Sequence, residues 1–166
     1  MATAPEMLAT PEMVIRTMVE ADVSAVVAIE RAAYQFPWSE GIFRDCLRVG
    51  YVCRVACSGD EVIGYGVMSV GAGEAHILNL CVNAHFRCRG VGRRMLEYLV
   101  DRASAAGMSE AFLEVRPSNT AAIRLYQSMG FEQVGIRRGY YQAVGGREDA
   151  AVLKLELQGR RPRTGS

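Results

Sequence analysis

The segment 87–94, RCRGVGRR, combines two glycines with four arginines between an apolar run and an amphipathic stretch. Glycines in such a place let the backbone approach a ligand closely, and the first N–H groups of a helix point outward without intrahelical partners. The helix dipole adds about half a positive charge at that end, and the arginine side chains add further positive charge. This combination of residues predicts a binding site for a pyrophosphate group.

Of the nucleotide-binding loop patterns compared, one fits this segment. The P-loop pattern GxxxxGK[ST] is absent from the chain, and the dinucleotide pattern GxGxxG fails because Met95 occupies its third glycine position. The pattern RxxGxG remains, over residues 87–92. A different interpretation stays open, in which the glycines only form a tight turn and the arginines only solvate the end of a helix.

Glu114 and Tyr126 are candidates for proton transfer. Glu114 is flanked by Leu113 and Val115 in a strand-like stretch, so we expect a half-buried carboxylate whose pKa is raised by burial. Tyr126 follows twelve residues later in a helical pattern, and its phenol could act as an acid. Alternatively, Glu114 pairs with an arginine at a sheet edge, and Tyr126 packs its ring in the core.

A base and an acid are what acyl transfer from a thioester to an amine requires. An ammonium group has no lone pair and must lose a proton, and an α-amino group with a pKa near ~8 needs only a modest base. The oxyanion formed during the transfer needs a hydrogen-bond donor, and the departing thiolate gains from a nearby acid. Glu114 and Tyr126 match the base and the acid of this reaction.

The hydrophobic periodicity predicts the elements that position these residues. Strands are expected over 14–16, 51–57, 61–70, 75–82, 111–115, 132–141 and 149–157, and helices over 23–33, 40–49, 91–106 and 119–129. Asp22, Ser39 and either Ser118 or Asn119 are expected to cap helices. The order indicates an α/β fold with a mixed sheet, antiparallel in its first half, and helices on both faces. The apolar run 75–82 predicts a central strand buried on both faces.

Length and composition fit one globular domain. The chain has 166 residues, of which 50% are hydrophobic and 22% charged, so we expect a domain over 13–157 with flexible tails over 1–12 and 158–166. No apolar run reaches the ~18 residues that a membrane span needs, and residues 1–13 lack the basic start of a secretory signal. We therefore expect a cytoplasmic protein without membrane contact.

The charge distribution favours a small anionic ligand over nucleic acid. The net charge is only +1, whereas a nucleic-acid-binding protein is usually strongly basic. Residues 84–166 hold fourteen basic and eight acidic side chains, so the second half is the expected location of an anionic ligand. The five cysteines include no CxxC pair, and neither histidine lies near such a pair, so we expect reduced thiols and no metal site.

With its RxxGxG segment between a strand and a helix, the sequence resembles the GCN5-related N-acetyltransferase (GNAT) superfamily. The resemblance implies the GNAT acyl-CoA N-acyltransferase fold, with acetyl-CoA as co-substrate. By position, it implies that the pantetheine arm contacts the backbone of Leu80, Cys81 and Val82. It also implies that the pyrophosphate is held by Cys88, Arg89, Gly90, Val91, Gly92 and Arg93.

The stretch 113–141, LEVRPSNTAAIRLYQSMGFEQVGIRRGYY, followed by GREDA, is similar to the bacterial ribosomal-protein-alanine N-acetyltransferase (RimI-type) branch of that superfamily. The similarity extends over about residues 13–157. It implies that Glu114 is the general base, that Tyr126 is the general acid, and that Asn119 contacts the cofactor. Asn119 can also cap the helix that it begins, and both roles can hold.

A further mark of the branch is Pro37-Trp38-Ser39 between the first two helices, in the loop that borders the acceptor site. Phe36 stands where the branch usually has His, so a polar role at that position is open. The resemblance implies that Trp38, Tyr140 and Tyr141 are substrate-binding residues on the acceptor side, and packing in the core or its rim is the alternative for all three.

The activity implied by the resemblance is Nα-acetylation of a small-subunit ribosomal protein at its N-terminal alanine. Transfer is expected to be direct, in a ternary complex, and not through an acyl-cysteine intermediate, since Cys81 is expected to be buried and Cys88 lies in the phosphate loop. The enzyme is expected to be a monomer. One alternative is an acetyltransferase acting on lysine side chains or small amines. Another is an acyl-CoA-binding module without chemistry, which would not need the pair of Glu114 and Tyr126.

Overall fold

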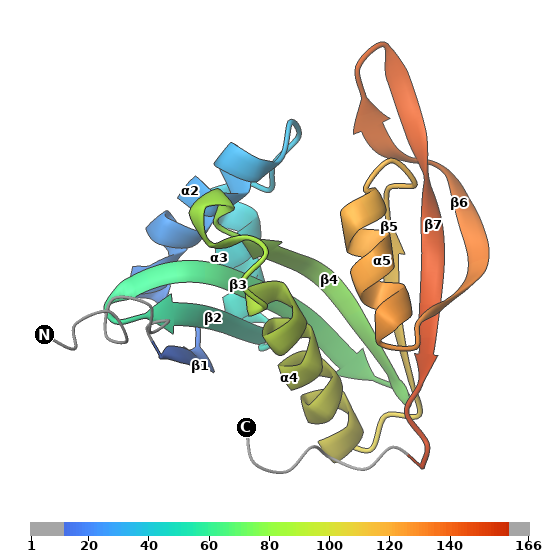
Figure 1. Cartoon of the computed structure of the whole chain (residues 1–166), viewed down its shortest axis with the longest axis horizontal. Helices are drawn as coiled ribbons and strands as arrows, with labels where there is room; N and C mark the ends of the chain where they lie inside the picture. Colours follow the sequence, from blue (N-terminus) through green and yellow to red (C-terminus); the bar gives the residue numbers. More distant parts are fainter. Residues whose placement is uncertain (1–11, 160–166) are drawn as a thin grey trace, which may run out of the picture.

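The computed structural model describes residues 12–159 of the chain. Seven strands form one sheet in the order β1-β2-β3-β4-β5-β7-β6 (Figure 1). The strands are β1 (Met13–Thr17), β2 (Val52–Ser58), β3 (Glu61–Gly71), β4 (Glu74–Val82), β5 (Glu110–Val115), β6 (Glu132–Ala143) and β7 (Gly146–Glu156). The helices are α2 (Val23–Ala33), α3 (Glu40–Arg48), α4 (Val91–Ala105) and α5 (Thr120–Ser128), with short 3-10 helices η1 (Glu20–Asp22) and η2 (Ala84–Phe86).

This architecture confirms the mixed sheet and the predicted order of helices and strands. The pairs β1–β2, β2–β3 and β3–β4 are antiparallel, and the pair β4–β5 is parallel. The helices α4 and α5 cover one face of the sheet, where their apolar side chains pack with residues of β4, β5 and β7. The helices α2 and α3 cover the other face over β2 and β3. Both faces are therefore covered, as the sequence predicts.

Two of the predicted helix caps are confirmed and one is wrong. The Ser39 hydroxyl accepts a hydrogen bond from the Ile42 N–H at the start of α3, and the Asn119 side chain accepts one from Ala122 at the start of α5. Asp22 does not cap α2. Its carboxylate accepts from the Val19 N–H and pairs with the guanidinium of Arg16, because the turn η1 precedes α2 and needs the cap instead.

The parting of β4 from β5 is the feature of the sheet that matters for the site. Parallel pairing covers only residues 74–77 of β4 and 110–113 of β5, after which the strands diverge (Figure 1). We call the diverging ends, residues 78–82 and 114–115, the strand fork. Leu78 is bulged against β3, since Val67 pairs with Asn79 and the next residue of β3 pairs with Ile77. Bulges of this kind bend a strand and recur next to active sites.

The prediction that the 75–82 run is buried on both faces is wrong in part. Ala75, Ile77 and Cys81 are buried, but His76 and residues 78–80 are only partly buried. The reason for 78–80 is the strand fork, which removes the neighbouring strand on one side. The strand β7 also begins three residues earlier than predicted, because pairing with β6 continues up to the turn at 144–145.

The predicted tails, 1–12 and 158–166, fall outside the described residues except for 12, 158 and 159. Within the described part, none of the helices combines the length and the apolar character that crossing a membrane requires.

Candidate active site

The loop before α4 presents the start of that helix as an open end. Cys88 and Gly90 both have positive φ angles, of 63° and 80°, which turn the chain sharply into the helix. No side chain caps α4, and its first intrahelical bond runs from the Arg94 N–H to the Gly90 carbonyl at 3.0 Å. The N–H groups of residues 91–93 are therefore left without intrahelical acceptors. Together with the helix dipole they form a site suited to an anion.

Gly90 and Gly92 differ in what a side chain at each position would meet. A Cβ at Gly90 would meet nothing within 4 Å, so the positive φ alone favours glycine there. Gly92 lies inside the first turn of α4, and a Cβ there would stand 3.6 Å from the side chains of both Val82 and Leu125. Gly92 thus keeps space open between the end of β4 and α5. The two glycines thus suit a narrow binding site for a diphosphate at the start of α4, which we call the cradle.

The arginines around the loop point in several directions. The Arg93 guanidinium donates to the Ser128 hydroxyl of α5 at 2.5 Å, and Arg94 donates to the Met13 carbonyl at 3.4 Å. The Arg89 guanidinium stacks on the ring of Phe86 at 5.5 Å. The partners of Arg93 and Arg94 are a hydroxyl and a carbonyl group, so neither guanidinium is paired with a carboxylate among the described residues and both keep their positive charge near the loop.

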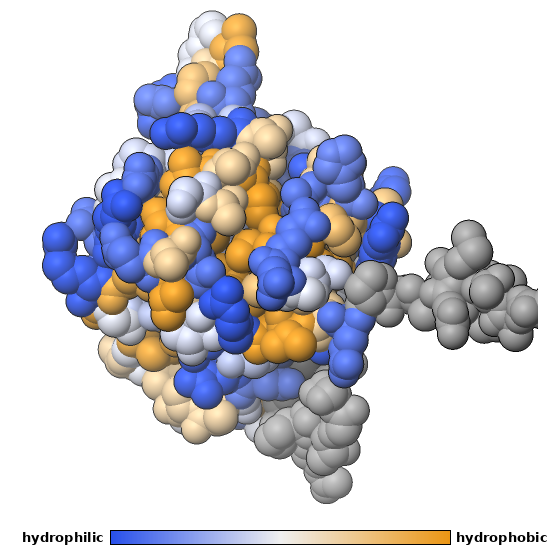
Figure 2. Space-filling view, turned by 90° about the vertical axis from the view of Figure 1, so that its left-hand side faces the viewer, coloured by the Kyte–Doolittle hydropathy of each residue, from blue (hydrophilic) through white to orange (hydrophobic). Residues whose placement is uncertain are grey.

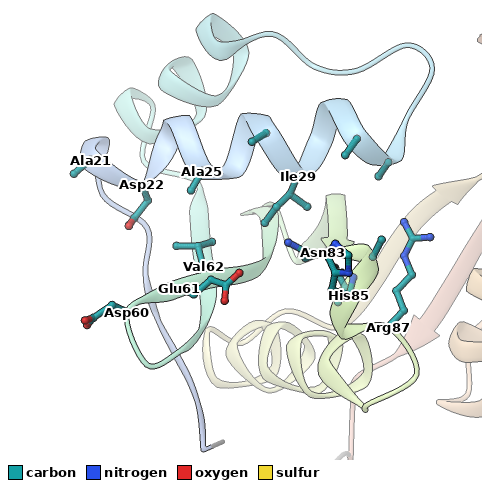
Figure 3. Close-up of a pocket in the computed structure, with 15 residues that line it drawn as sticks. Ala21, Asp22, Ala25, Ile29, Asp60, Glu61, Val62, Asn83, His85 and Arg87 are labelled. Atoms are coloured by element: carbon teal, nitrogen blue, oxygen red, sulfur yellow. Dashed lines mark hydrogen bonds between the residues drawn. The ribbon is translucent and has the colours of Figure 1, made fainter.

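A hollow of about 620 Å³ lies on the α2 side of this loop (Figure 3). Its walls are α2, the start of β3 and residues 82–87, and small apolar side chains such as Ala25 and Ile29 face it. Figure 2 views the molecule from the left-hand side of Figure 1 and shows patches of apolar surface between hydrophilic side chains on that face. The residues lining the hollow include neither Glu114 nor Tyr126, so it is separate from the candidate proton-transfer groups.

The second half of β4 is one side of the strand fork and leads toward residues 88–93, which we call the anion loop. Residues 79–82 pair with β3 on one side, and residues 78–82 have no partner on β5 among the described residues. The Leu80 carbonyl accepts a hydrogen bond from the Tyr34 hydroxyl at 3.3 Å, and Cys81 is buried. An unpaired strand edge offers N–H and C=O groups to an extended ligand. The edge at Leu80, Cys81 and Val82 suits a pantetheine arm, which carries amide groups.

Glu114 lies in the strand fork with a partner on each carboxylate oxygen. His76 Nε2 is 2.6 Å from Glu114 Oε2, and Arg137 Nη1 is 3.3 Å from Glu114 Oε1. Burial is the largest influence on this carboxyl and raises its pKa. The hydrogen bond and charge of His76, with the charge of Arg137, outweigh burial, so the pKa of Glu114 lies below its usual value. The predicted rise of this pKa is therefore wrong.

Tyr126 lies on the opposite face of the sheet from Glu114. Tyr126 packs in the core formed by α4 and α5, with its ring 5.9 Å from the ring of Phe131. Leu113 and Val115 belong to the same core, so the alternation along β5 turns Glu114 to the other face. Burial, with a smaller contribution from Cys81, raises the pKa of Tyr126 to about 12. The Tyr126 phenol therefore stays protonated at neutral pH.

Glu30 fixes the loop that contains Trp38. This carboxylate is only 2% exposed, and it accepts hydrogen bonds from the Trp38 N–H at 2.8 Å, from the Asn79 side chain at 2.9 Å and from the Tyr65 hydroxyl. It therefore ties the segment after α2 to the bulged region of β4. The Trp38 ring packs on Phe43 with centroids 5.3 Å apart, as the packing interpretation of this tryptophan expects.

Tyr140 and Tyr141 lie on an irregular stretch of β6. Pairing with β7 is interrupted between Arg137 and Tyr141, and the two tyrosine rings meet edge to face at 4.9 Å. The Arg116 guanidinium lies 4.4 Å from the Tyr141 ring centroid and donates to Glu148 at 3.0 Å. Tyr140 is 43% exposed, whereas burial, the main cause, raises the pKa of Tyr141. Only Tyr140 therefore presents much of its ring to solvent.

The residues 23–131 match the family model described as the acetyltransferase (GNAT) family. The chain belongs to this family. It is an N-acetyltransferase with the GNAT fold, as the resemblance implied. Acetyltransferases of this family use acetyl-CoA, and a putative Salmonella typhimurium acetyltransferase of the same fold, yncA, was solved with its cofactor acetyl-CoA.

Curated relatives of this GNAT acetyltransferase act on a ribosomal protein. The [ribosomal protein bS18]-alanine N-acetyltransferase of Salmonella typhimurium is 38% identical over 136 residues, which are 82% of this chain and 92% of the relative. The Escherichia coli K12 enzyme of the same name is 36% identical over 143 residues, or 86% of this chain and 97% of the relative. The crystal structure of the Escherichia coli ribosomal-protein-S18-alanine N-acetyltransferase superposes with a TM-score of 0.83 at 33% identity, covering 93% of this chain and all of that one.

The sequence predicted most residues of this candidate site but not His76 and Glu30, which contact it in the structure. Glu114 lies in the strand fork, Tyr126 packs on the other face of the sheet, and residues 88–93 lead into α4. Asn119 is a helix cap, and Trp38 and Tyr141 are largely packed. His76 and Glu30 were not singled out as site residues. A signal was available, because the apolar run 75–82 contains a histidine and an asparagine at positions that now contact these carboxylates.

Proposed function

We propose that this enzyme transfers the acetyl group of acetyl-CoA to the N-terminal alanine of the small-subunit ribosomal protein bS18. The observation that carries the proposal is the arrangement of Glu114 and Tyr126 on opposite faces of the strand fork, beside an anion loop. The relatives that act on bS18 match this chain over 82% or more of its length and have the same fold. We assign the activity to one domain over 13–157.

The cofactor side of the site is formed by β4 and α4. Acetyl-CoA supplies an acetyl group activated as a thioester. The backbone edge of Leu80, Cys81 and Val82 holds its pantetheine arm, and residues 88–93 hold its pyrophosphate through the open N–H groups at the start of α4. Asn119, at the start of α5 and close in sequence to Glu114, also contacts the cofactor in this proposal.

Glu114 and Tyr126 carry the proton transfers in this proposal. Glu114 accepts a proton from the ammonium group of the acceptor, so that the nitrogen can attack the acyl carbon. Tyr126 donates its phenolic proton to the departing sulfur from the opposite face, and the second proton of the attacking nitrogen passes to the phenolate as the amide forms. The buried Cys81 thiol is not an intermediate, because burial, the main cause, raises its pKa and keeps it protonated.

The state of Glu114 favours an α-amine over a lysine side chain as the acceptor. Its partners His76 and Arg137 keep its pKa low, so Glu114 is a weak base. An α-amino group loses its proton near pH ~8, whereas a lysine side chain holds it until about pH 10.4. A weak base therefore suffices for a protein N-terminus. We place the acceptor chain between the loop of Trp38 and the irregular part of β6 at Tyr140 and Tyr141.

The test uses two peptides with the sequence of the bS18 N-terminus, one with a free and one with an acetylated α-amine. We expect coenzyme A release and a mass gain of one acetyl group with the free peptide only. Acetylation of the blocked peptide at a lysine would contradict the proposed acceptor. Binding of acetyl-CoA without turnover on any amine would support the non-catalytic alternative. Since ribosomal proteins are made in the cytoplasm, the enzyme is placed there.

A further inference from the structure

His76 connects the proposed base to solvent. It lies in the parallel section of β4, opposite Ser69 of β3 and Phe112 of β5. Its Nε2 atom is 2.6 Å from Glu114 Oε2, the shortest polar contact of that carboxylate. The His76 side chain is 37% exposed, whereas the Glu114 side chain is 9% exposed. The pair therefore joins a buried carboxylate to a partly solvated imidazole.

The ionisable groups around this pair come from the strands β4, β5 and β6. Glu114 on β5 faces His76 through one oxygen and Arg137 on β6 through the other. Tyr141 on β6 is close enough for the charge of Glu114 to help burial raise its pKa. When His76 is neutral, the negative charge of Glu114 and the positive charge of Arg137 cancel. A protonated His76 leaves the group of three with one positive charge.

Resting on the proposed function, we propose that His76 is a positioning residue for the acetyl transfer. It holds the Glu114 carboxylate through its Nε2 atom, and it permits Glu114 to accept the acceptor's proton only while the imidazole is neutral. In that step an N–H bond of the ammonium breaks, its electron pair stays on nitrogen, and the proton bonds to Glu114. The bonds within His76 do not change.

Protonation of His76 opposes this step in two ways. An imidazolium beside a carboxylate stabilises the ionised form, so Glu114 becomes a weaker base. It also places a second positive charge near the incoming ammonium, which repels the acceptor.

The kinetic test compares His76→Gln with His76→Leu and uses His85→Gln as the control. A glutamine amide can donate to Glu114 with a similar reach but does not titrate, and leucine does neither. Wild-type kcat/KM for the free peptide should show an additional loss as the pH falls, beyond the loss from the acceptor amine. His76→Gln should lack that additional loss, and His76→Leu should be slower than His76→Gln by about tenfold at pH 8.

Two results of this series would overturn the proposal. One is an acidic limb in His76→Gln that is as steep as in the wild type. The other is equal turnover in His76→Gln and His76→Leu at pH 8. His85 is exposed in η2, away from Glu114, so His85→Gln should keep the wild-type profile.

A second readout does not depend on activity. The chain has two histidines, so NMR can follow the ring signals of His76 and His85 separately through a pH titration. The titration of His76 should change in the Glu114→Gln variant, and that of His85 should not. An unchanged His76 titration would refute the pairing. If the wild type acetylates no peptide while this coupling is present, the proposed function fails and the pairing stands.

Discussion

At the scale of single residues, the proposed chemistry depends on two side chains whose pKa values the fold shifts in opposite directions. The Tyr126 phenol is buried in an apolar core and keeps its proton, whereas Glu114 is held as a carboxylate by His76 and Arg137. A group that must donate a proton is thus protonated at neutral pH, and a group that must accept one is ionised. Each is ready for its proposed role before substrates bind.

The raised pKa of Tyr126 gives a prediction for alkaline solution. Since burial places that pKa at about 12, ionisation of Tyr126 should not reduce kcat between about pH 8 and 10. Tyr126→Phe should lower kcat about a hundredfold across the same range, because the leaving sulfur then lacks a proton donor. Steady-state kinetics with the free bS18 peptide measures both. A wild-type kcat that falls tenfold by pH 10, or a Phe variant with full turnover, would contradict this role.

The residue scale also shows how far sequence reasoning reaches. The types and spacing of Glu114 and Tyr126 were enough to predict them as a base and an acid. The sign of the Glu114 pKa shift could not be predicted, because it depends on His76 and Arg137, which lie 38 and 23 positions away along the chain. Only the register of β4, β5, β6 and β7 brings those two side chains to one carboxylate.

At the scale of secondary-structure elements, the start of α4 is the part that the proposed cofactor needs. Replacing Gly90 or Gly92 by alanine should affect stability and acetyl-CoA binding differently. Gly92→Ala should leave stability unchanged or raise it by up to about 1 kcal/mol, since the helix gains propensity and the added methyl group makes only ordinary contacts. The methyl group should weaken acetyl-CoA binding about tenfold by occupying the space beside Val82 and Leu125.

Gly90→Ala is the matched substitution. It should cost about 1 kcal/mol in the free energy of unfolding, because its φ of 80° disfavours any residue with a Cβ, and no clash adds to this cost. Urea unfolding and calorimetry with acetyl-CoA separate the two variants. Lower stability in Gly92→Ala with unchanged affinity would refute the proposed cradle.

The hydrogen bonds of Glu30 lead us to expect that this residue stabilises the loop between α2 and α3. Glu30→Gln keeps the volume of the side chain but removes part of its capacity to accept hydrogen bonds, so one of three buried donors loses its partner. The expected cost is about 1–3 kcal/mol in the free energy of unfolding, measured by urea denaturation. A variant as stable as the wild type would show that this carboxylate does not hold the loop.

The elements themselves were largely predictable, since strong apolar periods marked every helix and strand. The cap at Asp22 was mispredicted because the 3-10 turn η1 moves the start of the helical region back by three residues. The strand fork could not be predicted either. Continuous apolar sequence in β4 indicates a central strand, but it does not indicate that the neighbouring strand diverges halfway along it.

At the scale of the whole molecule, two carboxylates make the stability of the fold depend on pH. The hydrogen bonds from Arg16, which outweigh the opposing effect of burial, lower the pKa of Asp22, and the pKa of Glu114 is lowered too. A carboxyl whose pKa is lower in the folded state stabilises the fold fully above its unfolded pKa, about 4. That contribution is lost as the pH falls through the lower folded value.

Acid unfolding of Asp22→Asn tests this dependence. Above about pH 4 the variant should be less stable than the wild type, and the difference between them should shrink as the pH falls toward 2. Urea unfolding at several pH values measures it. A difference that stays constant from pH 7 to about pH 2 would show that the charge of Asp22 does not contribute.

The central claim is that Glu114 performs chemistry and does not hold the cofactor, and one variant tests it directly. Glu114→Gln should bind acetyl-CoA with wild-type affinity by calorimetry, because the cradle and the β4 edge lie elsewhere. Its kcat on the free bS18 peptide should fall by at least about a hundredfold, the contribution of a general base. Wild-type turnover in this variant would contradict the account.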